Sequence, residues 1–311
     1  MTEASGPRVR HRAAVARHGR ADGAPAVRGG KAAHLARLIK VEHSVYALPF
    51  AYAGAFLGAS GLPSWSRLVW ITVAMVGARS AAMALNRLID AGIDARNPRT
   101  ARRELPSGLL RRGEVLAFIV VSVTVLVVGA FNLSAPCRYL WPIPVAAFVV
   151  YPYTKRFTVL CHYVLGLTDG LAPAAAWVAV TGRVSWAAVL LFLAVGLWVG
   201  GFDVIYAIFD LDFDRREGIR TVAVALGAEA ALLVAAVSHV GAVALLATVG
   251  PLCHLGVVYY AGCGAVALLL GWSHVDIARR GLQRVGMSFM TVNGVVGLLY
   301  GAAAIAAALL A

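Results

Sequence analysis

The stretch NRLIDAGIDARNPRTARRELPSG, residues 86–108, follows about twenty residues that are apolar enough to lie in lipid. Its side chains Asn86, Asp90 and Asp94 stand four residues apart, so on a helix they share one face. Acidic side chains in or beside a membrane span are costly and therefore indicate a functional site by default. The alternative interpretation is an ordinary helix end whose acids are neutralised by the neighbouring arginines.

The composition around this stretch is that of a membrane protein with several spans. Of 311 residues, 60% are hydrophobic and only 14% are charged, and the mean hydropathy is +0.77. A spanning helix needs roughly 20 residues. We predict an all-α bundle of nine transmembrane helices from nine apolar runs that approach or exceed this length. These runs are residues 44–60, 68–89, 114–134, 139–154, 159–180, 185–206, 222–248, 252–271 and 286–310.

The basic residues predict how the spans are oriented. Of the 28 lysines and arginines, three lie in the first, third and fifth connections, and Arg79 lies inside a span. The remaining 24 belong to the N-terminal segment and the even-numbered connections. Because basic residues gather on the cytoplasmic side, we expect the N-terminus and the acidic stretch there, in a cell membrane. The net charge of +13 is then a sign of topology, and we exclude nucleic acid as a partner.

The N-terminal segment, the cysteines and the histidines add little to a functional prediction. Residues 1–35 are rich in Arg, Ala, Gly and Pro without a sustained apolar face, so we expect a disordered cytoplasmic tail before a transmembrane domain over residues 36–311. No apolar segment typical of a signal peptide follows the first charges. The four cysteines and eight histidines lack the spacing of a transition-metal site.

A second acidic stretch, GFDVIYAIFDLDFDRREGIRT at residues 201–221, repeats the arrangement of the first. Asp203, Asp210 and Asp214 lie at intervals of seven and four on one predicted helix face, with Tyr206 one turn after Asp203. Both stretches end even-numbered spans, so we expect both on the cytoplasmic side, facing each other. This repetition disfavours the helix-end interpretation and predicts two four-helix halves followed by one more helix.

Acids that repel one another need a cation between them. Carboxylates without nearby His or Cys indicate Mg²⁺, which takes oxygen ligands, keeps waters and bridges to substrate phosphates. Basic side chains beside the acids suit phosphate oxygens, arginine by bidentate contact and lysine as a point charge. These are Arg99, Arg102, Arg103, Lys155 and Arg156. The combination predicts a site for Mg²⁺ and a diphosphate.

These residues resemble the UbiA superfamily of intramembrane prenyltransferases. The first stretch matches the family's NxxxDxxxD element with the loop after it, and the second matches the family's second aspartate element. Weaker matches are EHSVYALPFAYAGAFLGA at 42–59, YPYTKRFT at 151–158, LGLTDGLAP at 165–173 and FMTVNGVVG at 289–297. Residues 1–36 find no counterpart. The resemblance implies nine helices around a cavity open to lipid, and transfer of a polyprenyl group from a polyprenyl diphosphate donor to a hydroxylated aromatic acceptor.

The resemblance also implies roles for individual residues. The Mg²⁺ ligands would be Asp90, Asp94, Asp210 and Asp214, supported by Asn86. The diphosphate would be held by Arg99, Arg103 and Lys155. The acceptor would be oriented by Arg156 and Asp203, and the path of the allylic cation would be lined by Tyr206. Residues 95–110 would cap the site and exclude water.

Two charged residues inside spans have two interpretations each. Asp169, in the fifth span, contacts the acceptor or is neutral and hydrogen-bonded within the bundle. Arg79, seven residues before Asn86, is a diphosphate ligand or the structural partner of an acid. Arg87 and Glu104 stand where the family often has Asp and Pro, a variation that we expect between its branches.

The matching loops are most similar to those of bacterial 4-hydroxybenzoate polyprenyltransferases and of their relatives in the futalosine route to menaquinone. The resemblance thus implies a role in ubiquinone or menaquinone biosynthesis. The usage of Ala, Val, Gly and Arg weakly favours a dihydroxynaphthoate acceptor. Alternatives are a sugar or glycerol phosphate acceptor, or a secondary transporter. Transporter sites lie near the bilayer midplane, whereas these acids stand at helix ends beside basic residues.

Overall fold

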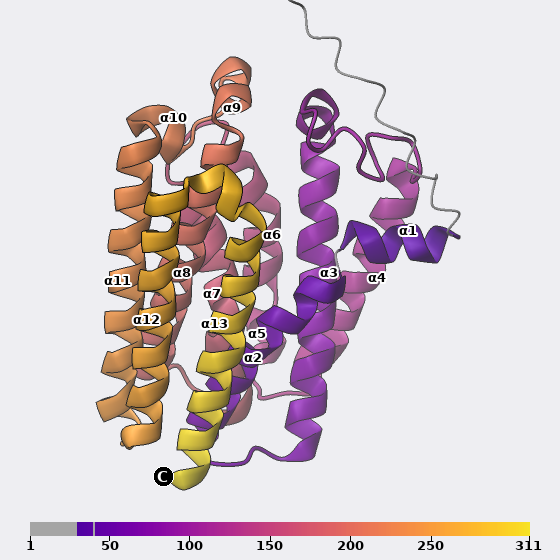
Figure 1. Cartoon of the computed structure of the whole chain (residues 1–311). Helices are drawn as coiled ribbons and strands as arrows, with labels where there is room; N and C mark the ends of the chain where they lie inside the picture. Colours follow the sequence, from indigo (N-terminus) through magenta and orange to yellow (C-terminus); the bar gives the residue numbers. More distant parts are fainter. Residues whose placement is uncertain (1–29, 40) are drawn as a thin grey trace, which may run out of the picture.

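The computed structural model describes residues 30–39 and 41–311, and within these all side chains except those of 41–47 and 282–290. The described residues form thirteen helices (Figure 1). Their bounds are α1 Lys31–Leu38, α2 Val41–Ala59, α3 Trp65–Arg96, α4 Arg112–Phe131, α5 Cys137–Leu140, α6 Pro142–Thr154, α7 Cys161–Thr181, α8 Trp186–Phe209, α9 Leu211–Glu217, α10 Val222–Leu226, α11 Ala228–Leu252, α12 Val257–Arg280 and α13 Leu282–Leu310. The all-α prediction is confirmed for this part of the chain.

Seven of these helices are long and apolar enough to cross a membrane. They are α3, α4, α7, α8, α11, α12 and residues Thr291–Leu310 of α13. The predicted first run corresponds to α2, whose apolar part Leu48–Ala59 is shorter, and the predicted fourth run is divided between α5 and α6. Pro142 begins α6 and Pro152 lies inside it, and each proline lacks the N–H that a continuous helix needs. The count of nine spans therefore stays a prediction.

The segment assigned to the tail is partly helical. Residues 1–29 lie outside the described residues, but residues 31–35 begin α1, which lies across α3 and α4 in Figure 1. Leu38 is buried in a cluster with residues of α3 and α4, and Lys31 forms an ion pair with Glu114 at the start of α4. The predicted boundary after residue 35 therefore falls inside a helix, and the bounds of the transmembrane domain stay a prediction.

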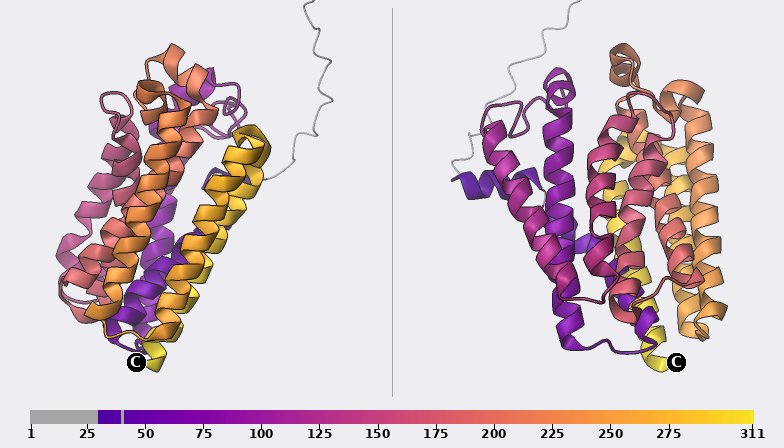
Figure 2. Two further views of the ribbon diagram at one scale, coloured as in Figure 1. Left: turned by 60° about the vertical axis from the view of Figure 1, so that its left-hand side comes forward. Right: turned by 180° about the vertical axis from the view of Figure 1, so that it is seen from behind.

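The helices do not separate into two four-helix halves. α3 packs mainly against α4, and this pair stands beside the larger group formed by α2, α7, α8, α11, α12 and α13 (Figure 2). α2 packs mainly against α7 and α13, and less against α3, its neighbour in sequence. Glycine makes this possible, because a Cβ on Gly54 of α2 would stand only 2.1 Å from the carbonyl oxygen of Pro173 in α7.

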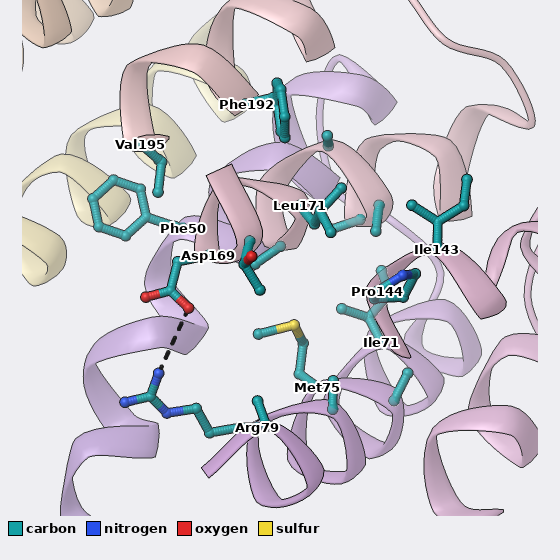
Figure 3. A pocket seen from close by; sticks show the side chains of 18 of the residues that line it. Phe50, Ile71, Met75, Arg79, Ile143, Pro144, Asp169, Leu171, Phe192 and Val195 are labelled. Atoms are coloured by element: carbon teal, nitrogen blue, oxygen red, sulfur yellow. Dashed lines mark ion pairs between the residues drawn. The ribbon is translucent and has the colours of Figure 1, made fainter. Parts of the chain in front are cut away.

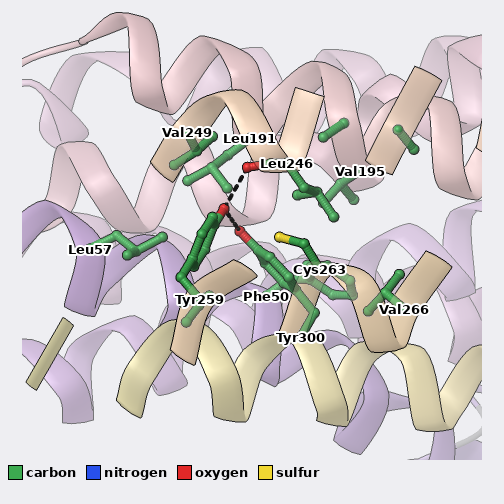
Figure 4. Close-up of a cluster of buried hydrophobic side chains, with 14 of the residues drawn as sticks. Phe50, Leu57, Leu191, Val195, Leu246, Val249, Tyr259, Cys263, Val266 and Tyr300 are labelled. Atoms are coloured by element: carbon green, nitrogen blue, oxygen red, sulfur yellow. Dashed lines mark hydrogen bonds between the residues drawn. The ribbon is translucent and has the colours of Figure 1, made fainter. Parts of the chain in front are cut away.

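The core of the larger group also contains two buried tyrosines whose hydroxyls are hydrogen-bonded. The hydroxyl of Tyr259 in α12 donates to the carbonyl oxygen of Leu246 in α11 at 2.7 Å and lies 3.0 Å from the hydroxyl of Tyr300 in α13 (Figure 4). Phe50 of α2 stacks on the Tyr300 ring. Because lipid offers no hydrogen bonds, such pairing is what keeps buried hydroxyls tolerable between spans.

Both acidic stretches lie at one end of the bundle. In Figure 1 the end of α3, the segment that follows it, α9 and α10 all stand at the top, opposite the C-terminus. The predicted meeting of the two stretches at one end of the bundle therefore holds in the structure.

Candidate active site

The first acidic stretch is the last part of an unbroken helix. α3 continues to Arg96, so Asn86, Asp90 and Asp94 share a face, and both aspartates are buried. The helix ends at Asn97, whose backbone is extended at φ −87° and ψ 118°. The next residue is proline, which disfavours the helical conformation in the residue before it. The chain then folds back over the helix end.

Asp90 lies among groups that come from two elements. Its Oδ2 accepts from Lys155 Nζ at 2.7 Å and from Asn86 Nδ2 at 3.2 Å. Arg156 Nη2 stands 3.7 Å from Oδ1, which is buried and has no hydrogen-bond partner among the residues that the structure describes. Lys155 directly follows the proline-rich helix α6. The position of this helix therefore brings the lysine into contact with Asp90, although the two residues are 65 positions apart in sequence.

Asp94 is held by the segment that follows α3. Arg103 Nη1 lies 2.8 Å from each of its carboxylate oxygens, and Arg87 Nη1 lies 3.9 Å from Oδ2. Thr100 Oγ1 donates to the Asp94 carbonyl at 2.9 Å, which satisfies a carbonyl at the helix end. Arg87, a departure from the family pattern, is therefore part of the site.

The second acidic stretch is a broken helix, which corrects the prediction of one continuous helix face. α8 ends at Phe209, and Asp210 leaves the helical conformation at φ −103° and ψ 9° before α9 begins. Asp212 and Asp214 then fall in the first turn of α9, where the helix dipole favours acids. Asp203 and Asp214 consequently belong to different helices.

Asp210 connects the two stretches. Arg99 Nε donates to its Oδ1 at 3.0 Å, Arg99 Nη2 donates to Oδ2, and Asn97 Nδ2 lies 3.3 Å from Oδ1. The hydrogen bonds to Asp210 raise the pKa of Arg99 above its ordinary value, so this guanidinium stays charged. A second ion pair joins Arg96 Nε to Glu217 at 2.7 Å. Arg96, Asn97 and Arg99 therefore join the end of α3 to the junction of α8 and α9 and to α9 itself.

Asp214 is the least neutralised of the four predicted metal ligands. It is buried, and in the described part of the chain no basic side chain lies within 4 Å of its carboxylate. Burial, followed by the nearby charge of Asp210, raises the pKa of Asp214 to about 7. A cation bound beside it would replace the proton that it holds near neutral pH.

The predicted ligand set is gathered at one end of the bundle but is not closed into a cluster. Among the described residues, no three His, Cys, Asp or Glu side chains converge as a metal site. Three of the carboxylates instead contact cations, which are Lys155 for Asp90, Arg103 for Asp94 and Arg99 for Asp210. The donors are carboxylate oxygens, and within the described part of the chain one oxygen of Asp90 lacks a hydrogen bond and Asp214 forms no ion pair. This set suits a hard cation such as Mg²⁺ together with an anion that attracts the three basic side chains.

The predicted acceptor pair is not in contact. Arg156 donates to the Ile89 carbonyl at 3.1 Å and stacks 4.6 Å over the Tyr153 ring, and no hydrogen bond or ion pair links its described side chain to Asp203. Asp203 Oδ2 lies 2.7 Å from His162 Nδ1. Sequence reasoning missed His162, because a lone histidine in an apolar run shows no motif. Its place in LCHYVLG, shortly after the matched segment at 151–158, was the available signal.

A cavity of about 630 Å³ lies between α3 with α4 on one side and α6, α7 and α8 on the other. Most of its lining is apolar, including Ile71, Met75, Ile143, Leu171 and Phe192 (Figure 3). Tyr206 lines it one turn after Asp203, and Cys137 and Trp141 line it toward α5. The cavity is thus an apolar space that begins beside the second acidic stretch.

Arg79 and Asp169 face each other in this cavity. Arg79 Nη1 lies 3.9 Å from Asp169 Oδ1, and both side chains point into the cavity in Figure 3. Arg79 thus contacts an acid, as one of its two interpretations requires, and its role stays a prediction. Asp169 pairs with an arginine inside the bundle, and it also borders the space that a bound molecule would fill.

The comparisons with known proteins agree with this geometry. Residues 47–309 match the UbiA prenyltransferase family. The chain is 32% identical over 245 residues to a 4-hydroxybenzoate octaprenyltransferase of Aliivibrio fischeri strain MJ11, covering 79% of this chain and 85% of the relative. It is 31% identical over 266 residues to the 4-hydroxybenzoate octaprenyltransferase of Tolumonas auensis, covering 86% and 93%.

Two solved structures show the same fold. A UbiA homolog from Aeropyrum pernix K1 superposes with a TM-score of 0.78 and 32% identity, covering 85% of this chain and 98% of that one. A UbiA homolog from Archaeoglobus fulgidus, bound to DMAPP and Mg²⁺, superposes with a TM-score of 0.65 at 18% identity, covering 88% and 99%. The chain therefore belongs to the UbiA prenyltransferase family, and it is a membrane-embedded prenyltransferase related to the 4-hydroxybenzoate polyprenyltransferases.

Proposed function

We propose that this protein transfers a polyprenyl group from its diphosphate to a ring carbon of a hydroxylated aromatic acid, with Mg²⁺, in quinone biosynthesis. The observation that carries the proposal is the meeting of two acidic helix ends and their basic partners beside an apolar cavity of about 630 Å³. Relatives named 4-hydroxybenzoate octaprenyltransferase support the acceptor class, and a solved homolog bound to DMAPP and Mg²⁺ supports the donor and the metal.

The charged groups at the helix ends are suited to a metal diphosphate. When bound, Mg²⁺ would be held by the four aspartates and would supply positive charge to the departing diphosphate. Arg99, Arg103 and Lys155 each neutralise one carboxylate in the structure. Their charges can turn to phosphate oxygens once the carboxylates contact a metal. Arginine then offers two parallel hydrogen bonds, and lysine offers a mobile point charge.

The apolar cavity suits the prenyl chain of the donor. The allylic C–O bond breaks with both electrons leaving on the diphosphate oxygen, and the ring carbon beside the acceptor hydroxyl supplies the electron pair of the new C–C bond. That carbon then loses its proton to the departed diphosphate, and the ring becomes aromatic again. Tyr206 lines the cavity beside Asp203, so its ring faces the path of the allylic cation. Residues 95–110, which contact the end of α3 through Thr100 and Arg103, would exclude water from the cation.

The acceptor is placed beside Asp203 in this proposal, on the side of the cavity formed by α8. Its hydroxyl donates to the Asp203 carboxylate, and Asp169 and Arg79 border the neighbouring space. Arg156 contacts the Asp90 side of the site, so its role in orienting the acceptor depends on a shift of its side chain. Both 4-hydroxybenzoate and a dihydroxynaphthoate carry the hydroxylated ring that this placement requires.

The site faces the cytoplasm in this proposal, and the chain crosses the cell membrane nine times with α2 and α6 as the two shorter crossings. The positive-inside bias places the end with the acidic stretches in the cytoplasm. The opposite end exposes Trp65, Tyr139 and Trp186, and such aromatic side chains are typical of a membrane interface.

Membranes that contain the protein test this function directly. They receive a polyprenyl diphosphate with Mg²⁺ and, separately, 4-hydroxybenzoate or 1,4-dihydroxy-6-naphthoate, and the product is detected by mass. We expect one ring to be prenylated, and we expect the product to disappear in Asp90→Ala and on chelation. Asp212→Ala is the matched control, because Asp212 is an exposed acid between Asp210 and Asp214. Asp90-dependent consumption of the donor without prenylation of either ring would overturn the acceptor assignment and leave the metal site standing.

A further inference from the structure

His162 is a buried histidine that touches both a predicted acceptor residue and the main chain after the second acidic stretch. It lies in the first turn of α7, and its side chain is 4% exposed. Its Nδ1 stands 2.7 Å from Asp203 Oδ2, and its Nε2 accepts from the Val222 backbone N–H at 3.4 Å. Both nitrogens of the imidazole are therefore engaged.

The Val222 contact determines where the imidazole carries its proton. A backbone N–H can only donate, so the Nε2 that receives it carries no hydrogen. The proton of the neutral ring is then on Nδ1, and Nδ1–H donates to the Asp203 carboxylate. The Asp203 carboxylate is the acceptor in this hydrogen bond.

The surroundings of His162 keep this arrangement rigid. The backbone N–H of Arg220 donates to the Lys155 carbonyl at 2.7 Å, and the Cys161 thiol contacts the Arg220 carbonyl at 3.4 Å. Thr221 caps α10 by accepting from the Val224 N–H at 3.1 Å. The start of α7 thus holds the segment after α9 on one side and the Asp203 carboxylate on the other.

We propose that His162 is a positioning residue for the acceptor, a role that rests on the proposed prenyl transfer. The Asp203 side chain remains 31% exposed while Oδ2 is held by Nδ1–H. The other oxygen, Oδ1, is then directed to accept the hydroxyl hydrogen of the aromatic acceptor. That hydrogen bond sets which ring carbon faces the allylic cation, and it adds electron density to the ring.

Two substitutions separate this role from a purely structural one. In His162→Gln, the amide N–H can donate to Asp203 and the amide oxygen can accept from the Val222 N–H. Both groups are attached to one carbon, as Nδ1 and Nε2 are attached to Cε1 in the imidazole, so this variant can keep both contacts. His162→Leu keeps an apolar volume and loses both contacts. We expect His162→Leu to lower kcat/KM for the acceptor about 10- to 100-fold, with the KM for the donor changed less than about twofold. His162→Gln should stay within about threefold of the wild type.

A double variant tests whether His162 acts through Asp203. If it does, His162→Leu combined with Asp203→Ala is no less active than Asp203→Ala alone. Equal losses for donor and acceptor, failure of His162→Gln to restore activity, or additive losses in the double variant would overturn the proposal. If His162→Leu does not reach the membrane folded, His162→Met replaces it, because its side chain fills the site without an N–H that could donate to Asp203. A wild-type protein that prenylates no ring would instead overturn the proposed function.

Discussion

The end of α3 and the end of α8 carry similar acids in different surroundings. At the end of α3 the helix is unbroken, and Asp90 and Asp94 each have a basic partner at 2.7–2.8 Å. At the end of α8 the helix breaks at Asp210, which is paired with Arg99, whereas Asp214 is buried without a basic side chain within 4 Å in the described structure. The first region is balanced by protein cations, and the second leaves one carboxylate to be balanced by a proton or a bound cation.

Because of this difference, we expect the two regions to respond differently to the loss of a basic side chain, to pH and to Mg²⁺. Loss of a basic side chain affects the first region more, because its buried acids then lack a counterion. The second region responds more to pH and to Mg²⁺, because the pKa of Asp214 lies at about 7. The following predictions test whether the two regions differ in this way while serving one reaction.

The largest expected effect is the loss of one carboxylate from either region. Asp94→Asn and Asp214→Asn should each lower kcat for prenyl transfer about a thousandfold or more, because each removes a ligand charge where the departing diphosphate gains its own. The measurement is product formation at saturating donor and acceptor, with membrane content matched by immunoblot. An activity that survives either substitution within about tenfold would contradict a shared metal site.

The next effect separates two arginines. Arg103 is 24% exposed and contacts the buried Asp94, whereas Arg99 is 58% exposed and contacts Asp210. Arg103→Lys should raise the KM for the donor about 10- to 100-fold, because lysine loses the planar two-point contact with phosphate. Arg99→Lys should raise it less, because water screens the exposed site. A larger rise in the KM for the donor in Arg99→Lys than in Arg103→Lys would show that the second region holds the diphosphate more strongly.

The sequence predicted the parts of this site that follow from local periodicity. The acids at 86–94 share a helix face because their spacing equals one helical turn, and apolar runs of fixed length predict the spans. The pairing of Lys155 with Asp90 and the contact of His162 with Asp203 join residues 65 and 41 positions apart, so no local pattern contains them. The break at Asp210 was also missed, because the acids at 203, 210 and 214 fit an unbroken helix equally well.

A moderate effect concerns pH in the second region. Below about pH 7 Asp214 holds a proton, which competes with Mg²⁺, so the apparent Mg²⁺ affinity should rise as the pH rises toward 7 and then level off. In Asp214→Asn, any Mg²⁺ affinity that remains should not change with pH in this range.

Without metal, the stability of the folded protein should change with pH in the opposite direction. The pKa is raised from 3.8 in the folded state, so the folded protein binds the proton more strongly and loses stability as the pH rises from about 4 to about 7. Thermal unfolding in detergent, with and without Mg²⁺, measures both trends.

The smallest expected effect concerns the exposed ion pair between the regions. Arg96 is 57% exposed and pairs with Glu217 at 2.7 Å, so water screens the attraction, and a surface pair of this kind contributes about 0–1 kcal/mol. Glu217→Gln should leave kcat within about twofold and the unfolding temperature nearly unchanged. Arg99 and Asn97 still join α3 to Asp210 in that variant. If Glu217→Gln instead lowered activity as much as Arg99→Lys does, the Arg96–Glu217 pair would be setting the distance between the two acidic ends, and the contacts of Arg99 and Asn97 with Asp210 would not be enough to hold the regions together.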